Sequence, residues 1–407
     1  MTEREFAADI VRRLRAAGHQ ALWAGGCVRD QLLGLDPHDY DVATDARPDQ
    51  VQALFRRTVA VGISFGVVEV LGPKPFKVQV ATFRSDGDYD DGRRPSSVTF
   101  SSPEQDARRR DFTINGIFFD PIDERVIDYV GGEADLHADI VRAIGDPRQR
   151  FTEDKLRLLR AVRFAARFRF TIEQATAAAI REMADQITVV SAERIADELR
   201  KMLTHRHRAA GLRLIEDAGL AKPIFPELVE AADRWRWGLN VVAELSEPVS
   251  FPLALAALLH TLHPDVAGRI ADRLRLSNAE KDRIEWLVDY QSALLDAPAL
   301  PKSRLKPILA HPGIRELLSL HRARAQADEW SDTPVVHVEY CEKCLRDWTI
   351  DVIDPPPLIT GDDLREMGLT PGPLFKELLD TVRCAQLDDK IVTKDEALAL
   401  ARSCVQN

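Results

Sequence analysis

Cysteine is scarce in this sequence, and no long apolar run interrupts it. Only five cysteines occur among 407 residues, and such an odd, sparse set does not build a disulfide framework, so we expect a reducing compartment. No stretch approaches the roughly 18 continuous apolar residues of a membrane span. The charged, amphipathic start MTEREFAADIVRRLR does not have the pattern of a signal peptide. These absences predict a cytoplasmic protein that does not contact a membrane.

An excess of positive charge is also lacking. Acidic side chains outnumber basic ones 65 to 55, which gives a formal net charge of −10. That balance excludes a uniformly basic nucleic-acid binder but leaves room for local basic faces. Apolar residues make up 45% and charged residues 29% of the chain, so wholesale disorder is excluded as well. The length favours roughly two to four domains at about 150 residues each.

Strand patterns are confined to the first part of the chain. Short apolar or alternating runs bounded by Gly, Pro and Asp predict strands at ALWAGG, YDVAT, VAVG, VVEVLG, FKVQVATF and VTF. After Gly145-Asp146-Pro147 these patterns stop, and apolar residues recur every three or four positions, as expected for helices. The sequence therefore predicts an α+β head followed by an extended helical arm.

Proline-containing breaks subdivide the helical arm. They lie at 222–226, at 297–302 and in the stiff connector DVIDPPP at 351–357. The predicted division of the chain is a head (1–145), a helical neck (146–205), a helical body (206–335) and a helical tail (336–407).

The most informative stretch is GGCVRDQLLGLDPHDYDVAT at 25–44. Asp39 and Asp41 are two apart in a strand pattern, which predicts that their side chains share one face. Mg²⁺ prefers one or two carboxylates together with substrate phosphates. Gly25 and Gly26 precede a helix expected to begin near Cys27, where backbone N–H groups can approach a triphosphate. Each pattern alone also fits a solvated strand edge or an ordinary turn, but their order is more specific.

In that order the string resembles the first motif of the polymerase-beta-type nucleotidyltransferases, in the branch of bacterial-type (class II) tRNA nucleotidyltransferases and poly(A) polymerases. RRRDFTIN at 108–115 resembles the next motif of that family, and EDKLRLLRAVRF at 153–164 resembles its nucleotide-selecting motif. LITGDDLREMGLTPGPLFKELL resembles the C-terminal region of the same enzymes. The resemblance implies a catalytic head with a mixed sheet and flanking helices, followed by an elongated all-α neck, body and tail. The neck would carry the nucleotide-selecting motif, and the tail would contact RNA.

The resemblance also implies roles for individual residues in the head. Asp39 and Asp41 would bind two Mg²⁺ ions and so be catalytic. The residues implied to contact the nucleotide and its phosphates are Gly25, Gly26, Arg29, Asp30, Arg110, Asp111 and Asn115. Guanidinium groups suit phosphate oxygens, and short polar side chains suit sugar hydroxyls, so the chemistry agrees with these roles.

A second set of residues is implied to select the base. These are Glu153, Asp154, Arg157 and Arg160, with Arg163 as a further candidate. A helix beginning after Thr152 would place Asp154 and Arg157 on one face, with Arg160 one turn further. Cytosine and adenine carry an amino donor beside a ring acceptor, so Asp154 accepting and Arg157 donating would admit them and exclude uracil and guanine. Glu153 would hold Arg157 or a neighbouring Arg. Acidic residues in a first helical turn are also favoured by the helix dipole alone.

One position departs from the family pattern. Relatives often carry Glu where this chain has Gln79, and an amide cannot take a proton or supply full negative charge. The resemblance leaves open whether Asp39 and Asp41 suffice or whether catalysis is slower.

Basic residues concentrate around the selecting motif. The segment 148–169 holds seven Arg and one Lys against two acids, where an RNA end and a triphosphate both need neutralisation. The positive character continues in the arm at Arg200, Lys201, Arg206, Arg208 and Arg213. Some of these side chains would simply form solvated helix faces, whereas others would contact RNA phosphates.

The predicted function is template-independent RNA nucleotidyl transfer, with C and/or A from CTP and ATP added to the tRNA 3′ end and pyrophosphate released. The product would be CCA or part of it, and no protein partner is implied. A poly(A) polymerase of the same family is the nearest alternative, and a non-catalytic RNA-binding protein on a decayed scaffold is an alternative of another class. A loop at 86–107 is expected to take part in the change from C to A addition.

Overall fold

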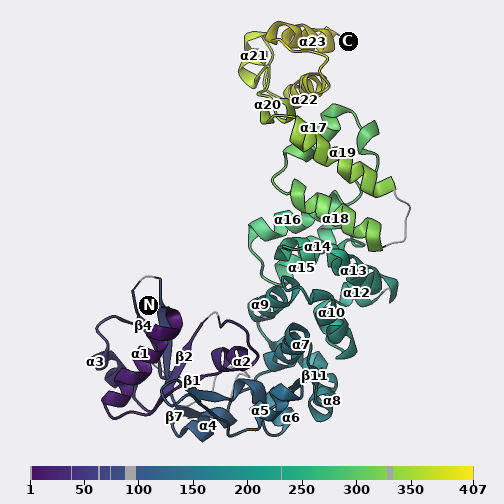
Figure 1. The fold of residues 1–407 in the computed structure, drawn as a ribbon. Helices are drawn as coiled ribbons and strands as arrows, with labels where there is room; N and C mark the ends of the chain where they lie inside the picture. Colours follow the sequence, from purple (N-terminus) through teal and green to yellow (C-terminus); the bar gives the residue numbers. More distant parts are fainter. Residues whose placement is uncertain are drawn as a thin grey trace. The chain divides into compact units, whose positions relative to one another are not determined.

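The computed structural model describes residues 2–37, 39–62, 65–73, 75–87, 98–230, 232–327 and 333–406. The chain divides into two compact units, residues 1–230 and 231–407, which are coloured from purple to teal and from teal to yellow in Figure 1. The predicted boundaries near 145, 205 and 335 fall inside these units and stay predictions.

A seven-stranded mixed sheet forms the centre of the first unit, with the strand order β3-β4-β5-β2-β1-β8-β9. The strands β2 and β5 are parallel, and the other neighbours are antiparallel. The strands are β1 (Ala21–Ala24), β2 (Asp41–Thr44), β3 (Thr58–Gly62), β4 (Val67–Leu71), β5 (Lys77–Thr82), β8 (Phe118–Asp120) and β9 (Arg125–Ile127). A separate pair joins β6 (Arg84–Asp86) to β7 (Val98–Phe100). All six segments predicted as strands are therefore confirmed, as is the mixed sheet.

One face of the sheet is covered by α1 (Glu3–Ala16) and α3 (Pro48–Leu54). The helix α1 begins with a capping box between Thr2 and Glu5. Its apolar face buries Phe6, Ile10 and Leu14, and each fully buried side chain of this size contributes about 1.5–3 kcal/mol. Because side chains alternate along a strand, the residues that begin or flank β2 on the opposite face remain available for a site.

Helices make up most of the rest of the first unit (Figure 1). They are α2 (Gly26–Leu32), α4 (Pro103–Arg108), α5 (Gly132–His137), α6 (Pro147–Glu153), α7 (Leu156–Phe168), α8 (Gln174–Met183), α9 (Ala192–Leu203), α10 (Arg208–Asp217), α11 (Ala221–Ile224) and α12 (Pro226–Val229). The prediction that strands stop after Pro147 is wrong at one place, because β11 (Thr171–Ile172) pairs in parallel with β10 (Ile140–Val141). Two-residue strands are too short to produce an alternating pattern.

The described part of the second unit is helical, as predicted for the arm. Its helices are α13 (Ala232–Glu244), α14 (Phe251–Leu259), α15 (Pro264–Arg273), α16 (Asn278–Asp289), α17 (Lys302–Ala310), α18 (Ile314–Ala327), α19 (Thr333–Asp347), α20 (Ile350–Ile353), α21 (Gly361–Glu366), α22 (Pro373–Leu387) and α23 (Lys394–Gln406). Among the residues described, no helix is both long and apolar enough to span a membrane. The cytoplasmic location stays a prediction.

Candidate active site

The glycine pair forms the turn between β1 and α2, as predicted. Gly25 is the N-cap of α2 and has a φ of 74°, a backbone conformation that residues with a Cβ atom rarely adopt. A Cβ atom on Gly25 would also lie 2.8 Å from Nη1 of Arg110. The absence of a side chain at this position therefore lets Arg110 lie directly against the turn.

The two predicted metal-binding carboxylates lie at the start of β2. The strand begins at Asp41, so the expectation that both acids lie within it is wrong for Asp39, which precedes the strand. Both residues keep exposed surface. The pKa of Asp41 is raised because surrounding protein desolvates its carboxylate and because Asp39 adds negative charge, while Arg110 opposes the rise. These interactions place Asp39, Asp41 and Arg110 in one electrostatic neighbourhood.

This neighbourhood fits a hard divalent cation. Carboxylate oxygens are the preferred ligands of such ions, and a cation would offset the charge that the surroundings of Asp41 disfavour. Within the described ranges, no group of three or more His, Cys, Asp or Glu side chains is arranged to hold a metal ion. Asp39 and Asp41 would therefore need further ligands from water and from substrate phosphates, as is usual for Mg²⁺.

Gln79 lies beside Asp41 in the sheet. The parallel pairing of β2 and β5 sets Asp41 opposite Gln79, and the antiparallel pairing of β5 and β4 sets Gln79 opposite Glu69. Residues paired in register point to the same face, so the neutral amide lies between two carboxylates. The carboxylate of Glu69 is 3.5 Å from Nζ of Lys77. A Glu at position 79 would make a row of three acids across neighbouring strands.

Arg110 is fixed by a residue that the sequence analysis did not identify. Asp106, in α4, is 1% exposed and accepts hydrogen bonds from Nε and Nη2 of Arg110 at 3.2 and 2.9 Å. Although burial opposes ionisation, Arg110 and Arg109 hold the pKa of Asp106 below its usual value. An acidic residue four positions before Arg110 was the signal available in the sequence, although Arg110 lies beyond the end of α4.

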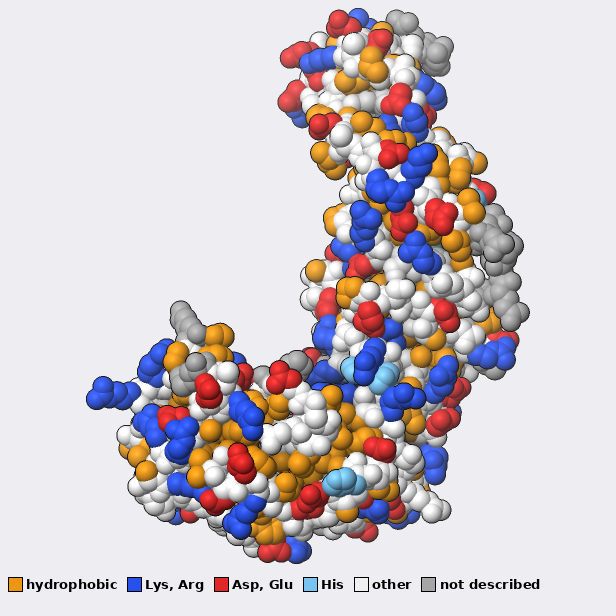
Figure 2. Space-filling model, viewed as in Figure 1, with side chains coloured by type: hydrophobic (Ala, Val, Ile, Leu, Met, Phe, Trp, Pro, Cys, Tyr) orange, Lys and Arg blue, Asp and Glu red, His pale blue; other side chains and the backbone are white. Residues whose placement is uncertain are grey.

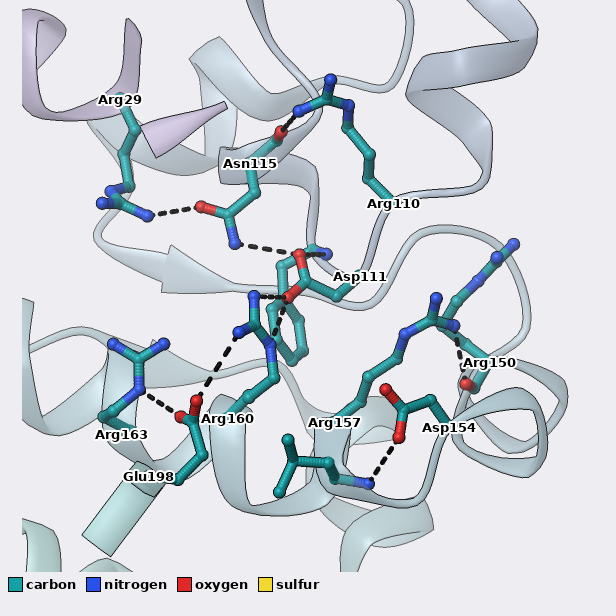
Figure 3. A network of polar contacts seen from close by, with 12 residues as sticks. Arg29, Arg110, Asp111, Asn115, Arg150, Asp154, Arg157, Arg160, Arg163 and Glu198 are labelled. Atoms are coloured by element: carbon teal, nitrogen blue, oxygen red, sulfur yellow. Dashed lines mark hydrogen bonds and ion pairs between the residues drawn. The ribbon is translucent and has the colours of Figure 1, made fainter. Parts of the chain in front are cut away.

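Asp111 is the centre of a buried polar network (Figure 3). Its Oδ2 accepts two hydrogen bonds from Arg160, from Nε at 2.8 Å and from Nη2 at 2.6 Å. Its Oδ1 accepts from Nδ2 of Asn115 at 2.9 Å and from the Phe112 amide at 2.8 Å. Despite burial, Arg160 and Asn115 hold the pKa of Asp111 far below its usual range. Both oxygens of this carboxylate are therefore already engaged by the protein.

The network reaches α2 in one direction and α9 in the other. Oδ1 of Asn115 accepts from Nη1 of Arg29 at 2.5 Å. On the other side, Glu198 of α9 lies 3.7 Å from Arg160 and accepts a hydrogen bond from Nε of Arg163. The sequence motif includes Arg163 but not Glu198, which is 3% exposed and lies 35 residues further along the chain. No local pattern indicates such a contact.

Arg29 and Asp30 are buried beneath the glycine turn. They are 4% and 6% exposed, and Oδ1 of Asp30 accepts from Nε and Nη2 of Arg29 at 2.8 and 2.6 Å. Oδ2 of Asp30 accepts from Nη2 of Arg167 at 3.0 Å. Their predicted contact with a triphosphate stays a prediction, while the observed contacts tie α2 to α7.

The predicted helix through the base-selecting motif is broken. The helix α6 begins after the N-cap Asp146 and ends at Glu153, and α7 begins at Leu156. Asp154 lies between them in an extended conformation, with φ −149° and ψ 104°. Its Oδ1 accepts the backbone N–H of Leu156 at 3.1 Å, and a local bond of this kind competes with helix formation. Thr152 is therefore not an N-cap, and Asp154 and Arg157 do not share one helix face.

Each member of the proposed selecting pair has a protein partner that holds it. Oδ2 of Asp154 lies 2.7 Å from Nη2 of Arg194, in α9. Oε2 of Glu153 accepts from Nη1 of Arg157 at 2.7 Å and from Nη1 of Arg150 at 2.8 Å. The expected contact of Glu153 with Arg157 is thus present. Figure 3 shows Asp154 and Arg157 beside each other at the start of α7.

Comparison with known proteins places this geometry in a family. Residues 21–142 match the poly A polymerase head domain, and residues 169–231 match a family described as the probable RNA and SrmB-binding site of polymerase A. The chain is 32% identical over 410 residues to the CCA-adding enzyme of Levilactobacillus brevis, covering 98% of this chain and 97% of that one. The chain belongs to the CCA-adding enzyme family.

Further members of the CCA-adding enzyme family agree with this assignment. The enzyme of Geobacillus stearothermophilus is 33% identical over 404 residues, which cover 96% of this chain and 95% of that one. The crystal structure of the Bacillus stearothermophilus CCA-adding enzyme in complex with CTP superposes with a TM-score of 0.82 at 28% identity, over 100% of this chain and 98% of that one. The Thermotoga maritima CCA-adding enzyme complexed with tRNA_CCA shares the fold, with a TM-score of 0.65 at 21% identity over 98% and 95% of the two chains. The family resemblance seen in the motifs is confirmed, and the chain is a nucleotidyltransferase.

Proposed function

We propose that this chain adds C and A from CTP and ATP to the 3′ end of tRNA, without a template and with release of pyrophosphate, so that the end reads CCA. The observation that carries the proposal is the convergence of Asp41, the Gly25 turn and Arg110 in one site. Through Asn115 and Asp111 the same site is joined to α7, the helix that carries Arg157.

The residues at β2 are proposed to hold Mg²⁺. Asp39 and Asp41 offer hard oxygen ligands, and Arg110 contributes positive charge next to the turn that would receive the triphosphate. Divalent cations bound there supply charge that favours attack by the RNA 3′-hydroxyl on the α-phosphate and departure of pyrophosphate. Asp106 keeps Arg110 in place for this role.

Base choice is proposed to rest on Asp154 and Arg157. A carboxylate oxygen of Asp154 accepts from the exocyclic amino group of C or A, and Arg157 donates to the adjacent ring nitrogen. Arg194 and Glu153 restrict the rotation of these two side chains, so the donor and acceptor positions are set before the nucleotide binds. Uracil and guanine carry a carbonyl oxygen in place of the amino group and a ring N–H in place of the ring acceptor. Their oxygen would face the Asp154 carboxylate, and their N–H would face the Arg157 guanidinium, so neither contact could form.

To test this, purified protein is incubated with Mg²⁺ and one of three tRNAs, which end before the first C, after CC, or after CCA. Each tRNA is given CTP alone, ATP alone, or both. We expect two C on the first tRNA, one A on the second and no addition to the third. Long A tracts on unrelated RNA would instead identify a poly(A) polymerase, and addition of only C or only A would identify a partial CCA enzyme. No addition in any lane would overturn the proposal.

A matched pair of variants tests the metal-binding assignment. Asp39→Ala should abolish transfer, whereas Asp36→Ala removes an exposed carboxylate from the same segment and should leave transfer unchanged. Transfer by Asp39→Ala at a rate close to that of the unmodified enzyme would contradict the assignment of this carboxylate.

The C-to-A switching role expected for 86–107 is retained only as a hypothesis. Residues 88–97 lie outside the described residues, and the rest of the segment contributes to β6, β7 and α4.

A further inference from the structure

A positively charged turn connects α9 to α10, outside the site described above. It contains His205, Arg206 and His207. The side chain of Arg206 is exposed and forms no hydrogen bond or ion pair with any residue in the described part of the chain. Figure 2 shows basic side chains gathered around imidazole groups in the region of α9 and α10.

Hydrogen bonds fix which nitrogen of each imidazole carries a proton. Nδ1 of His205 accepts the backbone N–H of His207 at 3.2 Å, so the proton of the neutral His205 ring lies on Nε2. Nδ1 of His207 lies 3.1 Å from the carbonyl oxygens of Ala166 and Arg167 and donates to them. The ring of His205 is partly exposed. His205 therefore offers an Nε2–H donor beside the free guanidinium of Arg206.

Several basic groups lie around His205. Burial lowers the pKa of His205 to about 4, and the positive charges of His207, Arg167, Arg206 and Arg208 add to the effect. Arg167 forms an ion pair with Asp30 at 3.0 Å. Among the described residues, no carboxylate forms an ion pair with His205, Arg206 or His207. Two kinds of donor and uncompensated positive charge meet here, which is the chemistry that recognises a phosphate.

The position along α7 separates this turn from the residue assigned to base selection. His207 is anchored to the carbonyl of Arg167, ten residues beyond the base-selecting Arg157, or about 15 Å along the helix at 1.5 Å per residue. The triphosphate is assigned to the Gly25 turn. We infer that the His205–Arg206–His207 turn binds a phosphodiester of the RNA substrate, with Arg206 and His205 Nε2–H as its donors. This inference rests on the proposed function for the identity of the RNA.

Arg206→Ala tests the contact, because the side chain is exposed and takes no part in the proposed catalytic site. RNA affinity is measured without nucleotide, with tRNA lacking its 3′ CCA, over a series of salt concentrations. We expect the dissociation constant to rise about 3- to 10-fold and the slope of log affinity against log salt to fall by about 0.7–0.9, the value for one phosphate contact. Arg206→Lys should retain most of the slope because it retains the charge. Arg12→Ala removes an exposed arginine from α1, paired with Asp9, and should change neither quantity.

The inference and the proposed function fail in different ways. If Arg206→Ala leaves the RNA affinity and its salt slope unchanged, the phosphate site is overturned, even if the enzyme adds CCA normally. The turn would then be a candidate for binding an acidic protein surface instead. A weaker affinity with an unchanged slope would overturn it too, because no phosphate contact would have been lost. With saturating tRNA, kcat of Arg206→Ala should equal that of the unmodified enzyme. If the unmodified enzyme transfers no nucleotide, the proposed function fails. The phosphate site still stands if Arg206→Ala lowers the salt slope of RNA binding as described.

Discussion

Replacing Asp111 with Asn would remove one negative charge from the buried network while nearly preserving its shape. The amide oxygen of Asn can still accept from the Phe112 amide and from Asn115. The amide nitrogen, however, would face the two N–H groups of Arg160, which now donate to Oδ2 at 2.8 and 2.6 Å. The change therefore tests whether the Asp111–Arg160 pair stabilises the joint between the sheet and α7.

The expected loss of stability follows from burial and from the remaining partner. Breaking a fully buried ion pair by removing one member costs about 3–5 kcal/mol. The Arg160 side chain is 31% exposed, and Glu198 remains 3.7 Å away, so we expect a smaller loss. We estimate about 2–3 kcal/mol. At about 2–4 °C per kcal/mol for a unit of this size, Tm should fall by about 4–12 °C.

Thermal unfolding of the full chain, followed by calorimetry, measures this effect, and pH adds a second readout. Asp111 has a pKa lowered from 3.8, so its ionised form stabilises the fold at pH values above that number, and the contribution is lost as pH falls further. The difference in Tm between the unmodified protein and Asp111→Asn should be constant from about pH 7 to pH 5 and shrink below about pH 4.

A surface pair provides the matched control. Asp9 lies 2.9 Å from Arg12 with both side chains exposed, so Asp9→Asn should change stability by less than about 0.5 kcal/mol. Our reasoning would be refuted if Asp111→Asn melted within about 1 °C of the unmodified protein at pH 7, or if its deficit grew in acid.

Three further changes test the site. Asp41→Asn should lower the rate of transfer at least about 100-fold. Because the pKa of Asp41 is raised in the folded state, its ionisation destabilises the metal-free fold at neutral pH. Asp41→Asn should therefore have a higher melting temperature than the unmodified protein without Mg²⁺, and a smaller rise in melting temperature when Mg²⁺ is added. A lower melting temperature of the metal-free variant in calorimetry would contradict this. Arg157→Ala should reduce discrimination against UTP and GTP by about 5- to 150-fold, the equivalent of 1–3 kcal/mol, with little change in tRNA affinity; competition assays that show the reverse would contradict the selection model. Gln79→Glu adds a charge between Asp41 and Glu69, so it should lower the melting temperature without metal. It should also enlarge the rise in melting temperature on adding Mg²⁺. An equal Mg²⁺-induced rise in the variant and in the unmodified protein would argue against a metal site on this row.

Much of the head could be predicted from local patterns. The strand that ends at Ala24, the glycine turn and the start of α2 follow from a short apolar run and two glycines. The later strands β8 (FFD) and β9 (RVI) were not predicted, because their three residues do not alternate between apolar and polar side chains as the VTF of β7 does. Their place in the sheet depends on long-range pairing.

The parts of the site that escaped prediction are those set by tertiary contacts. The sequence around Thr152 reads as a helix start, yet Asp146 and Pro147 begin α6 earlier and Asp154 interrupts the helical pattern by bonding to its own backbone neighbourhood. Glu198 and Arg194 reach the site only because α9 packs against α7. Neither contact leaves a trace in local spacing.

The interruption at Asp154 has a consequence for how new substrate preferences can arise. A residue inside a helix must satisfy the backbone bonds and propensity of that helix, so many replacements there reduce stability. Position 154 belongs to neither α6 nor α7, so a new side chain there does not have to satisfy the interior of either helix and, of the bonds to these helices, gives up only that from the Leu156 N–H at the start of α7. An engineer seeking an enzyme that appends a modified monomer would begin by randomising 154 together with 194, keeping the remaining scaffold intact.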